Sequence, residues 1–391
     1  MNKNKKSILI AVAAMVSLLI GNTAFSQTYN PIPVAVPSLQ IAPDARGGGM
    51  GDIGAATMPD VYSQYWNAAK YPFVKSQAGI SFSYTPWLSK LVNDIDLVYL
   101  AGYWKFGNEN LNAISTSLRY FSLGNIAITD LNGDFWQNVA PYELSFDVAY
   151  SRKLTETFSG AVTLRYIHSD YSYGPDDEVT PGNAFAADIA GYNETYLALG
   201  RSEALLGLGF NISNIGTKIS MDGGNTSEFI PTNLRLGTSL AYPIDEVNTI
   251  ALSFDINKLL VPTPPVKKEG ESDADWQARV EKYRDISPIA GIFKSFDDAP
   301  GGFNEEMKEI MWSLGTEYTY DQKFSVRMGY FNESAYKGNR KYFAFGAGFN
   351  IKSAFRLDAA YLVSTVQSNP LDQTLRLSLG FDIDGIRNLM R

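Results

Sequence analysis

A glycine-rich stretch near the N-terminus is the part of the sequence that most resembles a chemical motif. Gly49, Gly51 and Gly54 fit the pattern G-x-G-x-x-G, which in dinucleotide-binding folds lies between a strand and a helix and holds a pyrophosphate. Here Pro43 precedes the stretch, Pro59 follows it, and no alternation of strand and helix patterns comes after. We therefore expect no nucleotide, and we expect the glycines to permit tight turns and close approach of backbones.

A second candidate is the triplet His168-Ser169-Asp170, which contains the only histidine of the chain. A serine hydrolase, such as a membrane lipid A deacylase, needs its serine and its histidine within hydrogen-bonding distance. The triplet lies at the end of a predicted strand, where neighbouring side chains point to opposite faces. The sequence therefore predicts a solvated strand end and no enzymatic activity.

The composition offers few ligands for a metal or a cofactor, and we expect neither. The 391 residues include no cysteine, which excludes disulfides, thiolate metal sites and the lipid-bearing cysteine of a lipoprotein. Asp130, Asn132 and Asp134 have the spacing that begins a calcium loop, but the rest of the twelve-residue pattern is missing, so we interpret them as a turn. The net charge of −8 argues against a nucleic-acid partner.

The first 26 residues predict export. A basic stretch at 2–6 and an apolar stretch at 8–20 precede Ala24-Phe25-Ser26, which fits a cleavage site, so we expect a signal peptide over 1–26. An uncleaved membrane anchor is the alternative, but the apolar stretch is short for a membrane span. No later stretch has the pattern of a transmembrane helix.

The rest of the chain is dominated by alternation of apolar and polar residues. Between 374 and 383 the odd positions are apolar and the even positions polar, as expected of a strand with one apolar face. About fourteen segments behave in this way, most of them about ten residues long, which suits a tilted crossing of a bilayer. They lie near 78–86, 95–106, 111–122, 142–152, 158–169, 185–198, 203–213, 231–242, 247–258, 311–321, 323–332, 341–351, 354–365 and 373–383.

The connections between these segments are alternately short and long, which is typical of outer-membrane barrels. We expect an all-β fold: an antiparallel transmembrane β-barrel over 78–383, with a periplasmic tail at 384–391. A soluble β-sandwich or β-propeller is the alternative, but a sandwich would bury its apolar face in a core. The opposite face is instead polar enough for a wet or plugged lumen. It carries Arg235, Asp255, Glu317, Arg327, Arg356, Asp358, Arg376 and Asp382.

Two regions differ from the strand pattern. Residues 27–77 are rich in proline and glycine, and they form either a periplasmic tail or a plug; their aromatic residues favour the plug. The loop 259–310 contains two predicted helices, and the second has an apolar stripe. This stripe either folds onto the barrel mouth as a lid or docks a protein. The candidate partner-binding residues are Trp276, Tyr283, Ile289, Ile292, Phe293 and Phe296.

Four blocks of the sequence are distinctive: PDARGGGMGDIGAATMPDVYSQYWNAAKYPF (43–73), INKLLVPTPP (256–265), SPIAGIFKSFDDAPGGFNEEMKEI (287–310) and RMGYFNESAYKGNRKYFAFGAGF (327–349). Together they resemble the PorV (LptO) family of type IX secretion outer-membrane barrels. The family is similar in fold to FadL transporters, which have fourteen strands and an N-terminal hatch. The resemblance implies that the hatch includes Arg46, Gly49, Gly51, Gly54, Trp66 and Asn67.

Two functions follow as hypotheses. The resemblance implies an outer-membrane shuttle, which takes secreted cargo by its folded C-terminal β-domain from a SprA-type translocon to a surface attachment complex with a PorU-type sortase. The alternative is a FadL-like transporter of hydrophobic small molecules. A polar lumen offers no apolar path for a hydrophobic molecule, so it favours the docking of proteins at the outer loops. The candidate plug would obstruct the lumen, so a diffusion porin is the least favoured function. Outer-membrane lipid would surround the barrel in each case.

Overall fold

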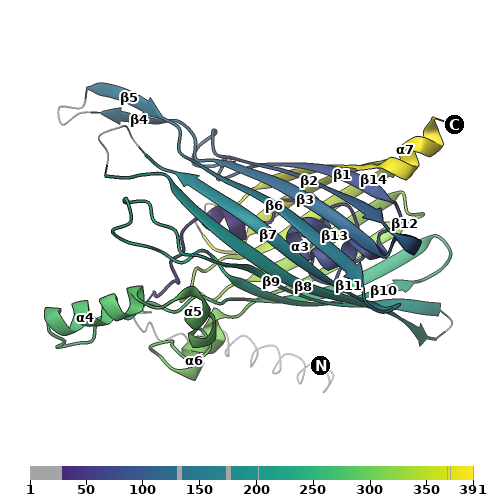
Figure 1. Ribbon diagram of the computed structural model, residues 1–391. Helices are drawn as coiled ribbons and strands as arrows, with labels where there is room; N and C mark the ends of the chain where they lie inside the picture. Colours follow the sequence, from purple (N-terminus) through teal and green to yellow (C-terminus); the bar gives the residue numbers. More distant parts are fainter. Residues whose placement is uncertain are drawn as a thin grey trace, which may run out of the picture.

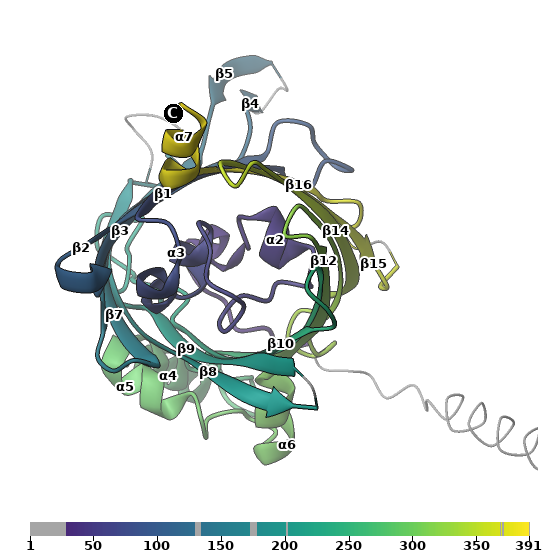
Figure 2. The same ribbon diagram turned by 90° about the vertical axis from the view of Figure 1, so that its right-hand side faces the viewer.

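The computed structural model describes residues 29–129, 134–172, 178–200, 202–367, 369 and 371–390. Within these residues, fourteen antiparallel strands close into one barrel, in which β1 pairs with β16 across the seam (Figures 1 and 2). The first strands are β1 (Ala78–Pro86), β2 (Asp96–Phe106), β3 (Asn112–Ser122), β6 (Tyr142–Lys153), β7 (Phe158–Asp170), β8 (Gly182–Leu199) and β9 (Ser202–Gly216). The remaining strands are β10 (Asn233–Pro243), β11 (Asn248–Leu259), β12 (Met311–Tyr320), β13 (Phe324–Asn332), β14 (Lys341–Ile351), β15 (Phe355–Ser364) and β16 (Leu375–Asp382).

The number of strands and their places confirm the expectation from period-two alternation. Strand β16 shows the physical reason: Leu377 is 39% exposed on the outer wall, whereas the neighbouring Arg376 is 3% exposed in the lumen. Closure of the barrel pairs every strand with two neighbours, and this leaves no open sheet edge for lipid to meet. The largest differences are in β8, which begins three residues earlier than the alternation indicated, and in β9, which ends three residues later.

The two ends of the barrel differ. Short turns connect the strands at one end, where β1 begins, β16 ends and helix α7 (Ile383–Leu389) follows (Figure 1). Long connections gather at the opposite end. The loop after β3 forms a small hairpin of β4 (Ile126–Thr129) and β5 (Phe135–Val139), which the sequence analysis treated only as a long loop. Asp130 and Asn132 of the supposed calcium loop lie outside the described residues.

The connection between β11 and β12, residues 260–310, forms a separate lobe at the long-loop end. It contains α4 (Asp273–Arg284), α5 (Pro288–Lys294), α6 (Phe303–Glu306) and the short turn η4 (Met307–Glu309). In the view along the barrel, these helices project outside the ring of strands beside β8, β9 and β10 (Figure 2). The lobe therefore does not cover the barrel opening with its helices.

Residues 29–77, here called the N-terminal segment, lie inside the ring of strands (Figure 2). The segment contains η1 (Pro37–Gln40), α2 (Ala45–Gly48), α3 (Ser63–Trp66) and η2 (Ala68–Phe73). It starts at the long-loop end, where the Asn30 amide donates to the Tyr336 carbonyl at 2.9 Å. It leaves at the short-turn end, where Lys105 Nζ donates to the Val74 carbonyl at 2.5 Å. The segment thus passes through the barrel from one end to the other.

The signal peptide expected over 1–26 lies outside the described residues. Among the helices of the described residues, none is long and apolar enough to cross a membrane.

Candidate functional site

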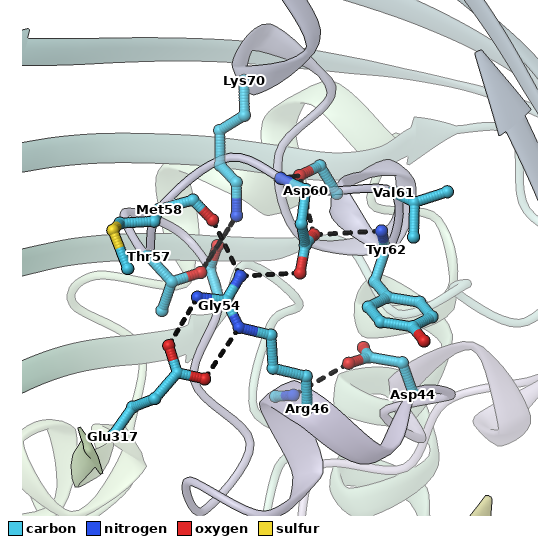
Figure 3. Close-up of polar contacts among 12 residues, drawn as sticks. Asp44, Arg46, Gly54, Thr57, Met58, Asp60, Val61, Tyr62, Lys70 and Glu317 are labelled. Carbon is cyan, nitrogen blue, oxygen red and sulfur yellow. Dashed lines mark hydrogen bonds and ion pairs between the residues drawn. The ribbon is translucent and has the colours of Figure 1, made fainter. Parts of the chain in front are cut away.

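An ion-pair network fixes the N-terminal segment to the barrel wall. The guanidinium of Arg46, on α2, donates to both carboxylate oxygens of Glu317 on β12, at 2.8 and 3.1 Å, and to Asp60 at 2.6 Å (Figure 3). It also donates to the Met58 carbonyl at 2.8 Å. Arg46, Asp60 and Glu317 are all buried. Such an arrangement is strongly directional, because a guanidinium and a carboxylate match each other in two parallel hydrogen bonds.

The network continues along the inner face of the barrel wall to the neighbouring strands. Arg327 on β13 donates to Glu317 at 2.5 Å and to Asp358 on β15 at 2.7 Å. Asp358 also accepts a hydrogen bond from Tyr62 of the N-terminal segment at 3.0 Å. Because charges buried in this way are stable only while all partners remain in place, the network specifies one position for the segment.

The G-x-G-x-x-G stretch is part of the same attachment. Asp255 on β11 accepts hydrogen bonds from the backbone amides of Gly54 and Ala55, at 2.9 and 3.0 Å. Lys70 Nζ donates to the Gly54 carbonyl at 2.9 Å and to Thr57 at 3.0 Å (Figure 3). The backbone amides that would hold a phosphate in a dinucleotide fold are here satisfied by a carboxylate of the barrel.

Glycines on both sides allow the segment to lie directly on the strands. Gly51 has a φ of +81°, and a Cβ there would meet the backbone of Tyr330 at 2.9 Å. A Cβ on Gly329 of β13 would lie 1.9 Å from the Met50 carbonyl carbon. Gly49 likewise packs against Gly346. This confirms the expectation that the glycines serve turns and close backbone approach.

Trp66 and Asn67 complete the contact on the opposite side of the lumen. Trp66 Nε1 donates to Asp44 at 2.5 Å, and the guanidinium of Arg235 lies 4.6 Å from the ring centroid. Asn67 is fully buried and donates to the carbonyls of Ala55 and of Gly191 on β8, both at 2.9 Å. Buried polar groups of the segment therefore have hydrogen-bond partners in the segment itself and in the strands around it.

All six residues assigned to a hatch lie in the segment inside the barrel and contact its wall or one another. The sequence analysis did not single out Asp44, Asp60, Lys70 or Arg119, although they hold the segment as well. Arg119 on β3 donates to the carbonyls of Ser38 and Ile41, at 2.6 and 3.0 Å. A signal was present for Asp44, Asp60 and Lys70, because they are charged residues in a stretch without strand periodicity. Their side-chain partners Trp66, Arg46 and Thr57 lie 13 to 22 residues away, which is beyond the range of periodicity and capping.

The triplet at the end of β7 has no catalytic arrangement. His168 Nδ1 lies 2.8 Å from Asn183 Oδ1 on β8, whereas Ser169 points to the buried side of the strand. The two side chains are on opposite faces, as strand geometry requires. Within the described residues, no cluster of three or more metal-binding side chains is found.

Serine residues cap the two longer helices of the lobe, which lie in the loop 259–310 where two helices were predicted. Ser272 caps α4 by accepting a hydrogen bond from the Asp275 amide, and Ser287 caps α5 by accepting one from Ala290. Pro288 occupies the first turn of α5, where its missing N–H costs no hydrogen bond.

The six candidate partner-binding residues divide into two groups. Ile289, Phe293 and Phe296 are exposed, with exposed fractions of 58%, 75% and 52%. The other three are half-buried within the lobe: they are Trp276, Tyr283 and Ile292. Tyr283, for example, donates to the Pro262 carbonyl at 3.2 Å. Phe303 and Met307 add to the exposed apolar side chains, and the sequence analysis did not include them.

A second group of charges fixes the base of the lobe. Lys258 at the end of β11 pairs with Glu309 at 2.5 Å and with Glu306 at 3.3 Å. Glu306 also accepts hydrogen bonds from the backbone amides of Asp298 and Ala299, both at 2.7 Å. Burial, and next to it the nearby carboxylates of Glu306 and Glu309, raise the pKa of Asp298 to about 7, against the hydrogen bond from Thr263 and the charge of Lys258.

We expect Asp298→Asn to stabilise the base of the lobe above pH 7. Because the pKa of Asp298 is raised in the folded state, its contribution is largest below about pH 4 and is lost as the pH rises through 7. The amide keeps an acceptor for Thr263 without the charge. Hydrogen exchange of residues 260–310, corrected for intrinsic rates, should lose its pH dependence between about 4 and 7. The neighbouring exposed Asp297→Asn is the control, and equal profiles for both variants would contradict the assignment.

Solved structures resemble the fold of this chain at low sequence identity. A monoaromatic hydrocarbon channel, a TodX mutant that lacks S2 and S3, matches with a TM-score of 0.50 and 11% identity, over 86% of this chain and 98% of that one. The Pseudomonas putida toluene transporter TodX has a TM-score of 0.49 and 11% identity, over 91% and 99% of the chains. A FadL homologue of Pseudomonas aeruginosa has a TM-score of 0.42 and 10% identity, over 90% and 99%. At such identities the likeness concerns the fold alone.

The sequence itself matches a protein family. No curated protein sequence matches the chain significantly. A family model described as type IX secretion system protein PorV matches residues 24–266, which is more than half of the chain. Together with the closed barrel and its lipid-facing apolar wall, this match shows that the chain belongs to the PorV family of the type IX secretion system and is a protein of the bacterial outer membrane.

Proposed function

We propose that this protein is a cargo shuttle of the type IX secretion system. It binds the folded C-terminal signal domain of secreted proteins at its long loops. It takes them from a SprA-type translocon to a surface attachment complex with a PorU-type sortase. In this function the barrel is a membrane anchor, and the chemistry is recognition without catalysis. The residues that we propose for binding are the exposed apolar side chains of the lobe.

The observation that carries this proposal is the contrast between the lumen and the lobe. In the lumen, buried ion pairs and close backbone contacts hold the N-terminal segment across the barrel. Outside it, Phe293 and its neighbours expose apolar surface on a lobe that is tied to the barrel by its own charges. Exposed apolar patches of this kind mark sites of protein interaction. The binding surface is therefore outside the barrel, as a shuttle of folded proteins needs.

A FadL-like transporter of hydrophobic small molecules is the second candidate. It is favoured by a cavity of about 640 Å³ with a largely apolar lining at the long-loop end. The solved structures of similar fold include proteins described as toluene or monoaromatic hydrocarbon transporters. For transport, however, the N-terminal segment would have to leave its ion pair with Glu317 and its hydrogen bond to Asp358 to open a path. A lipid A deacylase has no support in the positions of His168 and Ser169.

Affinity purification from the native outer membrane tests the proposal. A tag after α7 is well placed, because Met390 at the end of this helix is 75% exposed at the short-turn end. In mild detergent we expect a very large barrel protein and secreted proteins with a common C-terminal β-domain to co-elute, as identified by mass spectrometry. A barrel that elutes alone with bound fatty acid or another small hydrophobic molecule would instead support the transporter.

A further inference from the structure

A cavity of about 640 Å³ lies at the mouth of the barrel, at the long-loop end. We call it the mouth cavity. Its apolar lining comes from distant parts of the chain: the N-terminal segment, the loops that follow β1, β3 and β15, and the two strands that carry the lobe. The side chains used below are Ile32, Ile41, Ile95, Leu123, Leu259 and Met311. The volume is within the range of sites that hold a ligand or a few partner side chains.

The floor of the mouth cavity is formed by η1 of the N-terminal segment and is held in place by hydrogen bonds. The Ser38 amide donates to Glu143 at 3.1 Å, and Arg119 donates to the carbonyls of Ser38 and Ile41. The same segment continues into the ion-pair network around Arg46. A group that enters the mouth cavity therefore meets a fixed surface.

The charges at the rim are already paired. Lys337 forms ion pairs with Glu305 at 2.6 Å and with Glu309 at 3.0 Å, and Arg340 pairs with Glu333 at 2.8 Å. A charged ligand would have to compete with these pairs and lose its hydration. The mouth cavity is thus suited to an uncharged, apolar occupant.

The mouth cavity is continuous with the base of the lobe. Leu259 is the last residue of β11 and Met311 is the first of β12, so the two strands that carry the lobe also line the cavity. Glu309 joins the two further, because it pairs with Lys258 and with Lys337. A protein seated on the lobe therefore has this cavity beside it, at the same end of the barrel.

We propose that the mouth cavity receives an uncharged apolar segment of the cargo signal domain. The proposal rests on the proposed shuttle function and adds a second contact to the lobe. A few apolar side chains buried in a fixed pocket supply much of the affinity in a protein interface. The lobe would provide the exposed surface, and the mouth cavity would provide the anchor.

Two variants that fill the mouth cavity test this proposal. Leu123→Trp and Ile95→Trp each place a large side chain in the cavity, from two different loops. If one variant fails to fold, the other still tests the proposal. Leu154→Trp is the matched control, because Leu154 is 61% exposed in a short turn at the opposite end. The probe is the purified C-terminal signal domain of a secreted protein of the same cell. The measurement is its Kd for each full-length, heat-modifiable barrel in detergent.

We expect both cavity variants to weaken the signal domain's binding at least tenfold, while Leu154→Trp binds like the unmodified protein. Unchanged affinity in both cavity variants overturns the inference, and the shuttle function stands as long as the unmodified protein binds. Absence of binding to the unmodified protein contradicts the shuttle function itself. If native mass spectrometry detects a lipid that both variants displace without a change in cargo affinity, the mouth cavity is a lipid site and the inference is wrong.

Discussion

A Glu317→Gln protein is expected to lose about 3–5 kcal/mol of stability, the usual effect of removing one partner from a buried ion pair. Glu317 is 3% exposed and accepts hydrogen bonds from two guanidinium groups, those of Arg46 and Arg327. The amide offers one oxygen and no charge, so Arg46 and Arg327 each lose one of their two buried carboxylate partners and keep only Asp60 and Asp358. Urea unfolding of the refolded protein in detergent micelles, followed by tryptophan fluorescence, measures the loss.

The control for this variant is an exposed ion pair. Asp321 pairs with Lys323 in a short turn, and the Lys323 side chain is 73% exposed. Asp321→Asn should cost less than about 1 kcal/mol, because water and salt screen such pairs. A Glu317→Gln protein as stable as the Asp321→Asn protein would show that the N-terminal segment is not held by this network.

Simultaneous replacement of Ile292, Phe293 and Phe296 by Ser is expected to weaken cargo binding about 100-fold or more. The exposed Phe293 and Phe296 each bury apolar surface worth about 1–2 kcal/mol when a partner covers them, the half-buried Ile292 adds a smaller part, and about 1.4 kcal/mol is a factor of ten in Kd. The barrel should stay heat-modifiable and in the membrane, because the lobe is attached through Lys258 and Glu309 and not through these residues. Binding of a purified cargo signal domain and the yield of secreted cargo are the measurements.

Replacement of two exposed aromatic residues elsewhere serves as the control for this triple variant. Phe135 and Trp136 on β5 are 64% and 65% exposed at the same end of the barrel. Their replacement by Ser should leave cargo binding within about threefold, since surface changes away from a binding site have small effects. If the two sets of variants bind cargo equally well, the lobe is not the docking surface.

Much of the fold follows from local patterns in the sequence. Alternation over ten residues, as in 374–383, is sufficient to predict a strand with a lipid-facing side, because successive side chains of a strand point to opposite faces. The caps Ser272 and Ser287 were also predictable, since a cap involves residues only three positions apart. The small hairpin of β4 and β5 was missed, because its short strands do not show a clear alternation.

By itself, the sequence determined the barrel, its short and long connections, the polar character of its lumen and its family. Only the tertiary structure decided which charges meet. Arg46 and Glu317 are 271 residues apart, and the amides of Gly54 and Ala55 reach Asp255 some 200 residues further along the chain. It also formed the mouth cavity from seven separated segments. The physical reason is range: periodicity and capping act between near neighbours, whereas buried ion pairs and cavities depend on closure of the whole barrel around the N-terminal segment.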